Sequence, residues 1–317
     1  MVEAPSSPVK HLMIAKETIW GTAVAADKDV GLIVTESNNT FEREVMESLG
    51  LGQIDTQKIT TGIFDPKLTV NGEFQNGRML EFVFGTVTHA ETTGDWKHTF
   101  TVNNAVPSAT ISSSFDLATD IDVTNAGMIV ESCEITAELN GKLMTNYSLV
   151  GKTVATNTVS ETFSQSALSV FPHAMITVTI NNVAATICQS VGLTVAKTAL
   201  RAGGLGSNLY QQAAGDEMKY EVTATLGFDD LEYHALMLGG TSPSATSDPT
   251  SFDFVIDAKN GVALGSGQRQ LYLALENVQF KGFNEATSVG GITFVEVTGV
   301  GTFKSAHSVD NISDTNW

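Results

Sequence analysis

Positive charge is scarce in this sequence of 317 residues. It has 17 lysines and arginines against 35 aspartates and glutamates, which gives a formal net charge of −18 at pH 7. A tight or sequence-specific DNA binder needs a basic surface to neutralise phosphates, and none is visible here. The same negative field would be repelled by an anionic membrane surface, so no membrane partner is expected. Simple solubility, or a high-salt habitat, would also explain the acidic balance.

Other features of the composition exclude whole fold classes. Charged residues make up only 16% of the chain, prolines number 7 against 28 glycines, and there are 2 cysteines. No run approaches the roughly 18 apolar residues that a membrane-spanning helix needs. The palette of Thr, Ser, Asn and Gly favours strands and turns over a helical bundle. Cys133 and Cys188 lie in alternating apolar runs, so they are expected to be buried free thiols rather than a disulfide framework.

Catalytic and metal-binding motifs are also missing from the sequence. No pair of its histidines has metal-ligand spacing, and neither cysteine belongs to a CxxC motif. The glycine-rich segments at 203–206 and 261–267 lack the spacing of a phosphate-binding loop, so they are expected to be turns. There is no GxSxG nucleophile motif. The sequence therefore predicts no enzyme, no metal site and no cofactor.

The most informative feature that is present is an internal repeat at an offset of 154 residues. Gly50-Leu51-Gly52 matches Gly204-Leu205-Gly206. At the same offset three apolar positions of one strand fall on three apolar positions of another: Leu68, Val70 and Phe74 on Val222, Ala224 and Phe228. Apolar and polar residues alternate in both segments, which predicts two strands with one buried face each. Such a match indicates an internal duplication of the sequence.

Each copy then continues in the same way. Asn76 or Asp230 can cap a short helix, and Gly85 or Gly239 can end it. Further on, residues 129–135 resemble residues 274–280, at an offset of 145, and each segment precedes another β-rich run. We therefore expect an N-terminal arm at 1–28, a first unit at 29–152, a linker at 153–170, a second unit at 171–304 and a polar tail at 305–317. Trp317 in that tail could anchor a neighbouring copy.

A long polar segment, Glu36 to Asp65, separates the first two strands of the first unit, and Ala199 to Glu217 is its shorter equivalent. A connection of this length is expected to be either a contact loop or a disordered surface loop. In the first case its central residues are the candidates for contact: Gly50, Leu51, Gly52, Gln53 and Asp55.

The opening segment 16–24, with the sequence KETIWGTAV, leads into a strand near residues 30–35. Together with the order of strand, long loop, strand, short helix and further strands, it resembles the start of tail tube proteins of long-tailed (siphovirus-type) phages and related archaeal tailed viruses. The similarity is one of pattern over most of the chain, without a diagnostic motif.

This resemblance implies a mainly β fold with two tandem β-sandwich or barrel tube domains, each flanked by a short α-helix. In that family six tube domains make a ring with a continuous inner β-barrel, and stacked rings conduct the viral genome from capsid to host. Two fused domains imply a pseudo-hexameric ring of three chains. The implied partners are further copies of the chain, the tail terminator, tail tip and tape-measure proteins, and double-stranded DNA that passes without specific binding. The protein would be assembled in the host cytoplasm and end in the virion tail.

The resemblance also gives the acidic residues a use, because a wall rich in carboxylates lets DNA slide without sticking. Residues 132, 134, 136 and 138 form a polar face opposite an apolar one. On this reading the lumen-facing candidates are Glu73, Glu134, Glu138 and Glu221. Alternation does not say which face is inner, so an outer solvated face remains the alternative. A capsid decoration or an adhesion module remains an alternative. A carbohydrate-binding β-sandwich would be expected to show aromatic platforms, but aromatics are only 8% of the chain, and Trp20 and Trp96 are not clustered with other rings.

Overall fold

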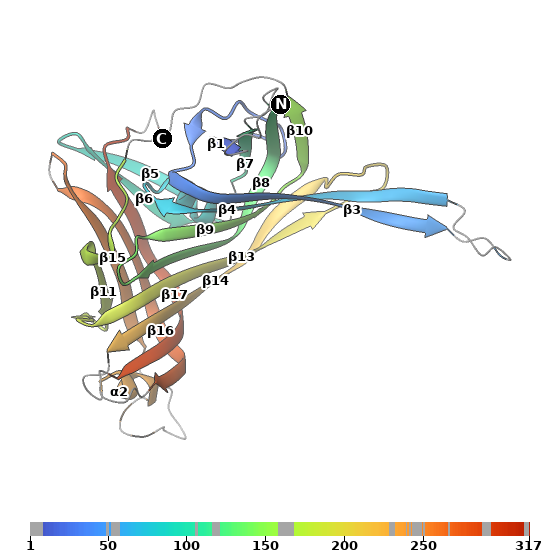
Figure 1. Ribbon diagram of the computed structural model, residues 1–317. Coiled ribbons are helices and arrows are strands. Elements are labelled where there is room, and N and C mark those ends of the chain that lie inside the picture. Colours follow the sequence, from blue (N-terminus) through green and yellow to red (C-terminus); the bar gives the residue numbers. More distant parts are fainter. Residues whose placement is uncertain are drawn as a thin grey trace, which may run out of the picture.

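The computed structural model of the protein is built mainly of antiparallel β-strands (Figure 1). It describes residues 9–48, 51, 58–104, 107–115, 121–157, 168–227, 232–238, 240, 242, 249, 251–265, 267–286, 293–313 and 317. The elements of the first half are β1 (Val9–Lys16), β2 (Lys28–Asp29), β3 (Leu32–Ser48), β4 (Lys58–Phe74), α1 (Arg78–Phe84), β5 (Gly85–Thr92), β6 (Asp95–Val102), β7 (Ala109–Phe115), β8 (Ile121–Glu138), β9 (Met144–Val150) and β10 (Thr153–Asn157). Those of the second half are a short 3-10 helix (His173–Met175), β11 (Ile176–Ile180), β12 (Val183–Ala184), β13 (Cys188–Ala202), β14 (Gln212–Gly227), α2 (Glu232–Leu238), β15 (Phe252–Ala263), β16 (Gln268–Ala286) and β17 (Phe294–Asp310).

One large sheet runs through both halves in the spatial order β3, β4, β9, β8, β13, β14, β17, β16, β15, β11. The sheet curls into a half-barrel, and the two long hairpins β3–β4 and β13–β14 project from it on the same side (Figure 1). A smaller group of strands, β1, β2, β7 and β10, pairs around the first part of β8. The mainly β class expected from the sequence is confirmed.

The core lies on one face of the large sheet, as period-two patterning dictates. In β4 the side chains of Leu68, Val70 and Phe74 are buried, while the residues between them stay partly exposed. Helix α1 covers this face, and all seven of its residues are buried. Its N-cap residue is Gly77 rather than the expected Asn76, which precedes the cap and whose Oδ1 accepts a hydrogen bond of 3.0 Å from the backbone N–H of Arg78. A helix this short is held by packing on the sheet rather than by its own propensity.

The segment 36–65 is not the loop that the sequence predicts. Most of it is strand, because β3 runs to Ser48 and β4 begins at Lys58, and the two pair over almost their whole length. At its far end this two-stranded ribbon is exposed on both faces, so no apolar residue has to alternate with a polar one. The same is true of 199–217, of which only 203–211 connects β13 to β14.

The two hairpins share their pairing register at an offset of 154. In β3–β4, Glu36 pairs with Asn71, and bulges fall between 34 and 36 and between 43 and 45. In β13–β14, Ser190 pairs with Thr225, and bulges fall between 188 and 190 and between 197 and 199. Both bulges thus recur at equivalent positions, and bulges fix the register of a hairpin.

The strands that follow also correspond, but at an offset of 150. β8 pairs with β9 around a bulge between Val130 and Ser132, and β16 pairs with β17 around a bulge between Phe280 and Gly282. The expected match of 129–135 with 274–280 is therefore wrong by five residues. The cause is a further irregularity in β16 between Glu276 and Gln279, which shifts the alternation of that strand relative to the sequence of β8.

The C-terminal residues also differ from the polar tail that the sequence predicts. Residues 305–310 continue β17, and residues 306–310 pair with β6 of the first half. Trp317 does not serve as a free anchor, because its ring stacks on His98 with centroids 3.6 Å apart. His98 is fully buried, and its Nε2 lies 3.1 Å from Oδ1 of Asp310. Both cysteines are free as expected, Cys133 buried and Cys188 half-buried.

Candidate functional site

The face of the large sheet opposite the core is polar and extends across both halves of the chain. Strand pairing places residues of six strands in one continuous row across this face, in the order Glu36, Asn71, Asn146, Glu134, Thr194 and Glu221. A second row crosses the sheet near its other end and contains Glu138, Ser190, Thr225 and Glu296. The sheet is therefore two-faced, with a dry side and a wet side that carries carboxylates.

The four acidic residues expected on one face do share this polar face, but they differ in their surroundings. Glu73 Oε1 lies 2.6 Å from Nζ of Lys142, and Glu221 is ion-paired with Lys281. Glu134 and Glu138 are exposed, and no cation is within ion-pair distance of either in the described part of the chain. Glu296 and Glu36 lie on the same face and were missed, although the alternation of 293–300 could have found the first.

The tips of the two hairpins are a second exposed feature. Leu51 and Leu205 occupy equivalent positions, and both side chains are fully exposed. Of the other candidate contact residues, Gly50, Gly52, Gln53 and Asp55 lie outside the described residues. Large exposed apolar side chains on projecting elements are typical of contact surfaces.

The two halves are joined by strand pairing between β8 and β13. Seven residue pairs run antiparallel, from Ser132 opposite Ala196 to Glu138 opposite Ser190. On the core side, Cys133 meets Val195 and both are buried. Burial raises the pKa of the Cys133 thiol far above its usual value, so this cysteine is a packing residue and not a nucleophile.

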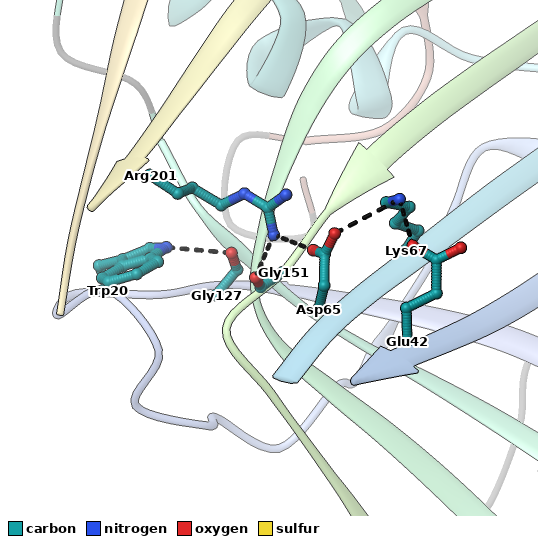
Figure 2. A network of polar contacts seen from close by, with 7 residues as sticks. All are labelled: Trp20, Glu42, Asp65, Lys67, Gly127, Gly151 and Arg201. Carbon is teal, nitrogen blue, oxygen red and sulfur yellow. Dashed lines mark hydrogen bonds and ion pairs between the residues drawn. The ribbon is translucent and has the colours of Figure 1, made fainter. Parts of the chain in front are cut away.

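Beyond the end of the strand pairing, a network of polar contacts also joins the two halves (Figure 2). Arg201 of β13 donates hydrogen bonds to Oδ1 of Asp65 at 2.5 Å and to the carbonyl of Gly151 at 3.1 Å. Its guanidinium also lies 4.3 Å from the ring centroid of Tyr210. Lys67 continues the network, since its Nζ lies 2.7 Å from Oε2 of Glu42 and 3.3 Å from Oδ2 of Asp65.

The carboxyl group of Glu131 also interacts with the charges at this junction. Burial raises the pKa of the Glu131 carboxyl, and the nearby Arg201 opposes that rise. The backbone also crosses between the hairpins, because the N–H of Phe64 donates to the carbonyl of Asn208 at 2.9 Å. The first half thus presents Asp65, Lys67 and Glu131 to Arg201 of the second half.

The segment 16–24, which carried the sequence resemblance, is fastened to the first half by Glu17. Its buried carboxylate accepts four hydrogen bonds, from the backbone N–H of Gly21 and Gly127 and from the hydroxyls of Ser108 and Thr110. Trp20 Nε1 donates to the carbonyl of Gly127 at 3.0 Å (Figure 2). The Glu and Trp of this motif are therefore anchors of the N-terminal arm.

The described residues offer no place for metal chemistry, since no group of three or more His, Cys, Asp or Glu side chains could hold an ion. A cavity of about 570 Å³ is open to solvent and is lined in part by Lys197, Tyr220 and Phe303. Burial lowers the pKa of Lys197, and the carboxylates of Asp216 and Glu217 belong to the same lining. Neither described helix has the length and apolar character needed to cross a membrane.

One comparison with known proteins identifies a family for this chain. The family model described as "Phage tail tube protein" matches residues 9–291, which is most of the chain. No curated protein matched the sequence. The family match favours a tail component over a capsid decoration, an adhesion module or a carbohydrate-binding module. The chain belongs to the phage tail tube protein family, and it is a structural component of the virion tail.

Proposed function

We propose that the chain carries two tube domains, residues 29–152 and 171–304, and that three chains close one pseudo-hexameric ring of the tail tube. The observation that carries this proposal is the shared register of β3–β4 and β13–β14, in which two bulges recur at an offset of 154. Two unrelated hairpins have no reason to place both bulges at the same distance from each end. The matching pair β8–β9 and β16–β17, with one bulge each, supports the same conclusion.

The pairing of β8 with β13 supports the ring itself. It joins four strands of the first domain to six strands of the second in one curled sheet. A sheet that curls over half a barrel leaves two open edges, and pairing them with further copies removes edges that would otherwise invite aggregation. Closed rings are the usual outcome when head-to-tail contacts of this kind complete a rotation.

The polar face is proposed to line the lumen. Glu134 and Glu138 are exposed there, and Glu73 and Glu221 lie on the same face with a lysine beside each. Each neutralised phosphate adds salt-dependent affinity to a DNA contact, so excess carboxylates keep double-stranded DNA from sticking during ejection. The hairpin tips around Leu51 and Leu205 are proposed to contact the next ring, and the ends of the tube to contact tail tip, tail terminator and tape-measure proteins.

Electron microscopy of the purified protein, with class averages viewed along the ring axis, tests this proposal. Hollow tubes with three chains per ring and pseudo-sixfold density are expected. Six chains per ring would keep the tube but contradict two tube domains per chain. Protein that stays monomeric even after a tail-tip complex is added would contradict self-assembly into a tube.

A further inference from the structure

The four charges at the junction between the domains have counterparts elsewhere in the chain. The first domain presents Asp65, Lys67 and Glu131, and the second domain inserts Arg201 among them. Asp65 and Lys67 lie on β4, so their equivalents at an offset of 154 are Lys219 and Glu221 on β14.

Glu131 lies in the bulge of β8, so its equivalent at an offset of 150 is Lys281, in the bulge of β16. Arg201 has Glu47 of β3 as its equivalent. The sign of the charge is reversed at all four positions.

The reversed set is exposed at the other side of each domain. Lys281 is ion-paired with Glu221, and about half of the Lys281 side chain is exposed. Lys219 is 73% exposed, and its Nζ lies 3.6 Å from Oε2 of Glu217. Glu47 is exposed on β3, near the projecting end of the first hairpin. The second domain therefore carries an exposed group of charges, Lys219, Glu221 and Lys281. The first domain carries an exposed carboxylate, Glu47, of opposite sign to Lys219.

Two sheet edges accompany these charges. Within the described residues β3 pairs only with β4, and β16 beyond Val278 pairs only with β17. At the equivalent place inside the chain, Val195 pairs with Cys133 and both are buried. The counterpart of Val195 is Phe41, which is 47% exposed, and the counterpart of Cys133 is Phe283, which is half-buried.

We propose that β16 of one copy pairs with β3 of the next in the register of β8 and β13, with Phe283 opposite Phe41 of the next copy. At this contact Lys219 pairs with Glu47 of the next copy, in the same way that Asp65 pairs with Arg201 inside the chain. This inference rests on the proposed ring and assigns the residues of its contact between chains. Lys219 bridges Glu217 and Glu47, as Lys67 bridges Asp65 and Glu42 within the first domain.

The reversal of charge makes the two kinds of junction non-interchangeable. If a first domain met the first domain of another copy, Asp65 would face Glu47, and both are acidic. If a second domain met another second domain, Lys219 would face Arg201, and both are basic. Like charges placed together disfavour wrong partners, so first and second domains must alternate around the ring.

Charge-swap variants of the full-length chain test the assignment. Glu47→Arg and Lys219→Glu are each expected to raise the concentration needed for ring and tube formation at least about tenfold, measured by sedimentation and electron microscopy. The combination Glu47→Arg/Lys219→Glu restores the opposite charges and should return that concentration to within about threefold of wild type. Glu44→Arg, three residues from Glu47 on the same exposed strand, is the matched control and should assemble like wild type.

A disulfide test checks the register independently of charge. Phe41→Cys/Phe283→Cys should cross-link copies to one another on mild oxidation, because residues paired across two strands have Cα atoms within disulfide reach. Wild type, with Cys133 and Cys188 only, is the control and should stay unlinked.

The outcomes separate this inference from the ring proposal. Wild-type tubes combined with no rescue in the double variant and no cross-link would overturn the pairing and leave the ring intact. Failure of wild type to assemble at all would overturn both. Rescue together with cross-linked ladders that end at three chains supports both.

Discussion

The hairpins β3–β4 and β13–β14 share one backbone pattern but differ in the burial of their side chains. In β13, Val191, Leu193 and Val195 are buried because β8 lies beside them. Their equivalents in β3 are Ser37, Asn39 and Phe41, which are partly or well exposed in the single chain. Register therefore follows bulges and turns, whereas side-chain character follows what lies on the next edge of the sheet.

The arms that precede the two hairpins differ more deeply. β1 and β2 are connected by residues 17–27, which Glu17 and Trp20 fasten to the first half of the chain. β11 and β12 are connected by only Asn181 and Asn182, both with positive φ, as a tight two-residue hairpin turn requires. The first half thus relies on buried polar contacts where the second half relies on local turn geometry.

The largest effect is expected from breaking the polar anchor around Glu17 in the first half of the chain. Glu17→Ala leaves two buried N–H groups and two hydroxyls without their acceptor, and should lower the free energy of unfolding by about 3 kcal/mol. Urea unfolding followed by tryptophan fluorescence measures this, since Trp20 belongs to the same arm. Glu17→Gln, which keeps one acceptor oxygen, should lose less. A loss below about 1 kcal/mol for Glu17→Ala would contradict the anchor.

A smaller effect is expected at the junction between the two halves of the chain. Arg201→Glu places a carboxylate beside Asp65 in a mostly buried site, and should cost about 2 kcal/mol of unfolding free energy. Asp65→Arg/Arg201→Glu should recover at least half of that loss. The equivalent substitution on β3, Glu47→Arg, changes an exposed side chain and should alter the stability of the single chain by less than about 0.5 kcal/mol. If Arg201→Glu and Glu47→Arg lowered the free energy of unfolding equally, the predicted difference between the β8–β13 junction and the outer edge of β3 would be wrong.

The third prediction concerns pH and the strand β17, which pairs with β6 of the first half of the chain. Burial, and then the nearby Lys97, lowers the pKa of His307 to about 4, while the unfolded chain keeps the ordinary value near 6.5. The unfolded state binds more protons between these two values, so stability falls as pH drops from 6.5 to 4.

His307→Phe keeps the stacking on Tyr272 and removes that proton. Because the ring is only partly buried, the variant should gain on the order of 1 kcal/mol relative to wild type on going from pH 7 to pH 4. Urea unfolding at both pH values measures this difference, and a parallel pH dependence in the two proteins would contradict it.

The smallest effect on folding is expected at the hairpin tips. Leu51→Asp and Leu205→Asp replace fully exposed side chains, so each should change unfolding free energy by less than about 0.5 kcal/mol. Both should nevertheless shorten tubes seen by electron microscopy, because the tips are proposed to touch the next ring. Different outcomes for the two variants would show that the hairpins are not equivalent in stacking, and normal tubes with both would remove the tips from that contact.

The sequence predicted those elements whose buried face alternates with a polar one. Leu68, Val70 and Phe74 revealed β4, and Asn76 with Gly85 bracketed α1 closely. The sequence did not predict the outer part of β3 as a strand, because neither of its faces is buried in a single chain. The correspondence of β8 with β16 was misplaced, because bulges interrupt the alternation on which that match depended. The four acidic candidates share one face, and that much followed from period two alone.

The sequence by itself determined the β class, the two faces of each alternating strand and the lack of catalytic motifs. Each of these is written in composition or in local spacing, within the reach of one strand or one turn. Only the tertiary structure decided which strands meet, and so brought Asp65 to Arg201 and joined the two halves of the chain through β8 and β13. Asp65 and Arg201 are 136 positions apart, and the paired residues of β8 and β13 are 52 to 64 positions apart. Alternation carries no information about which edge lies beside which.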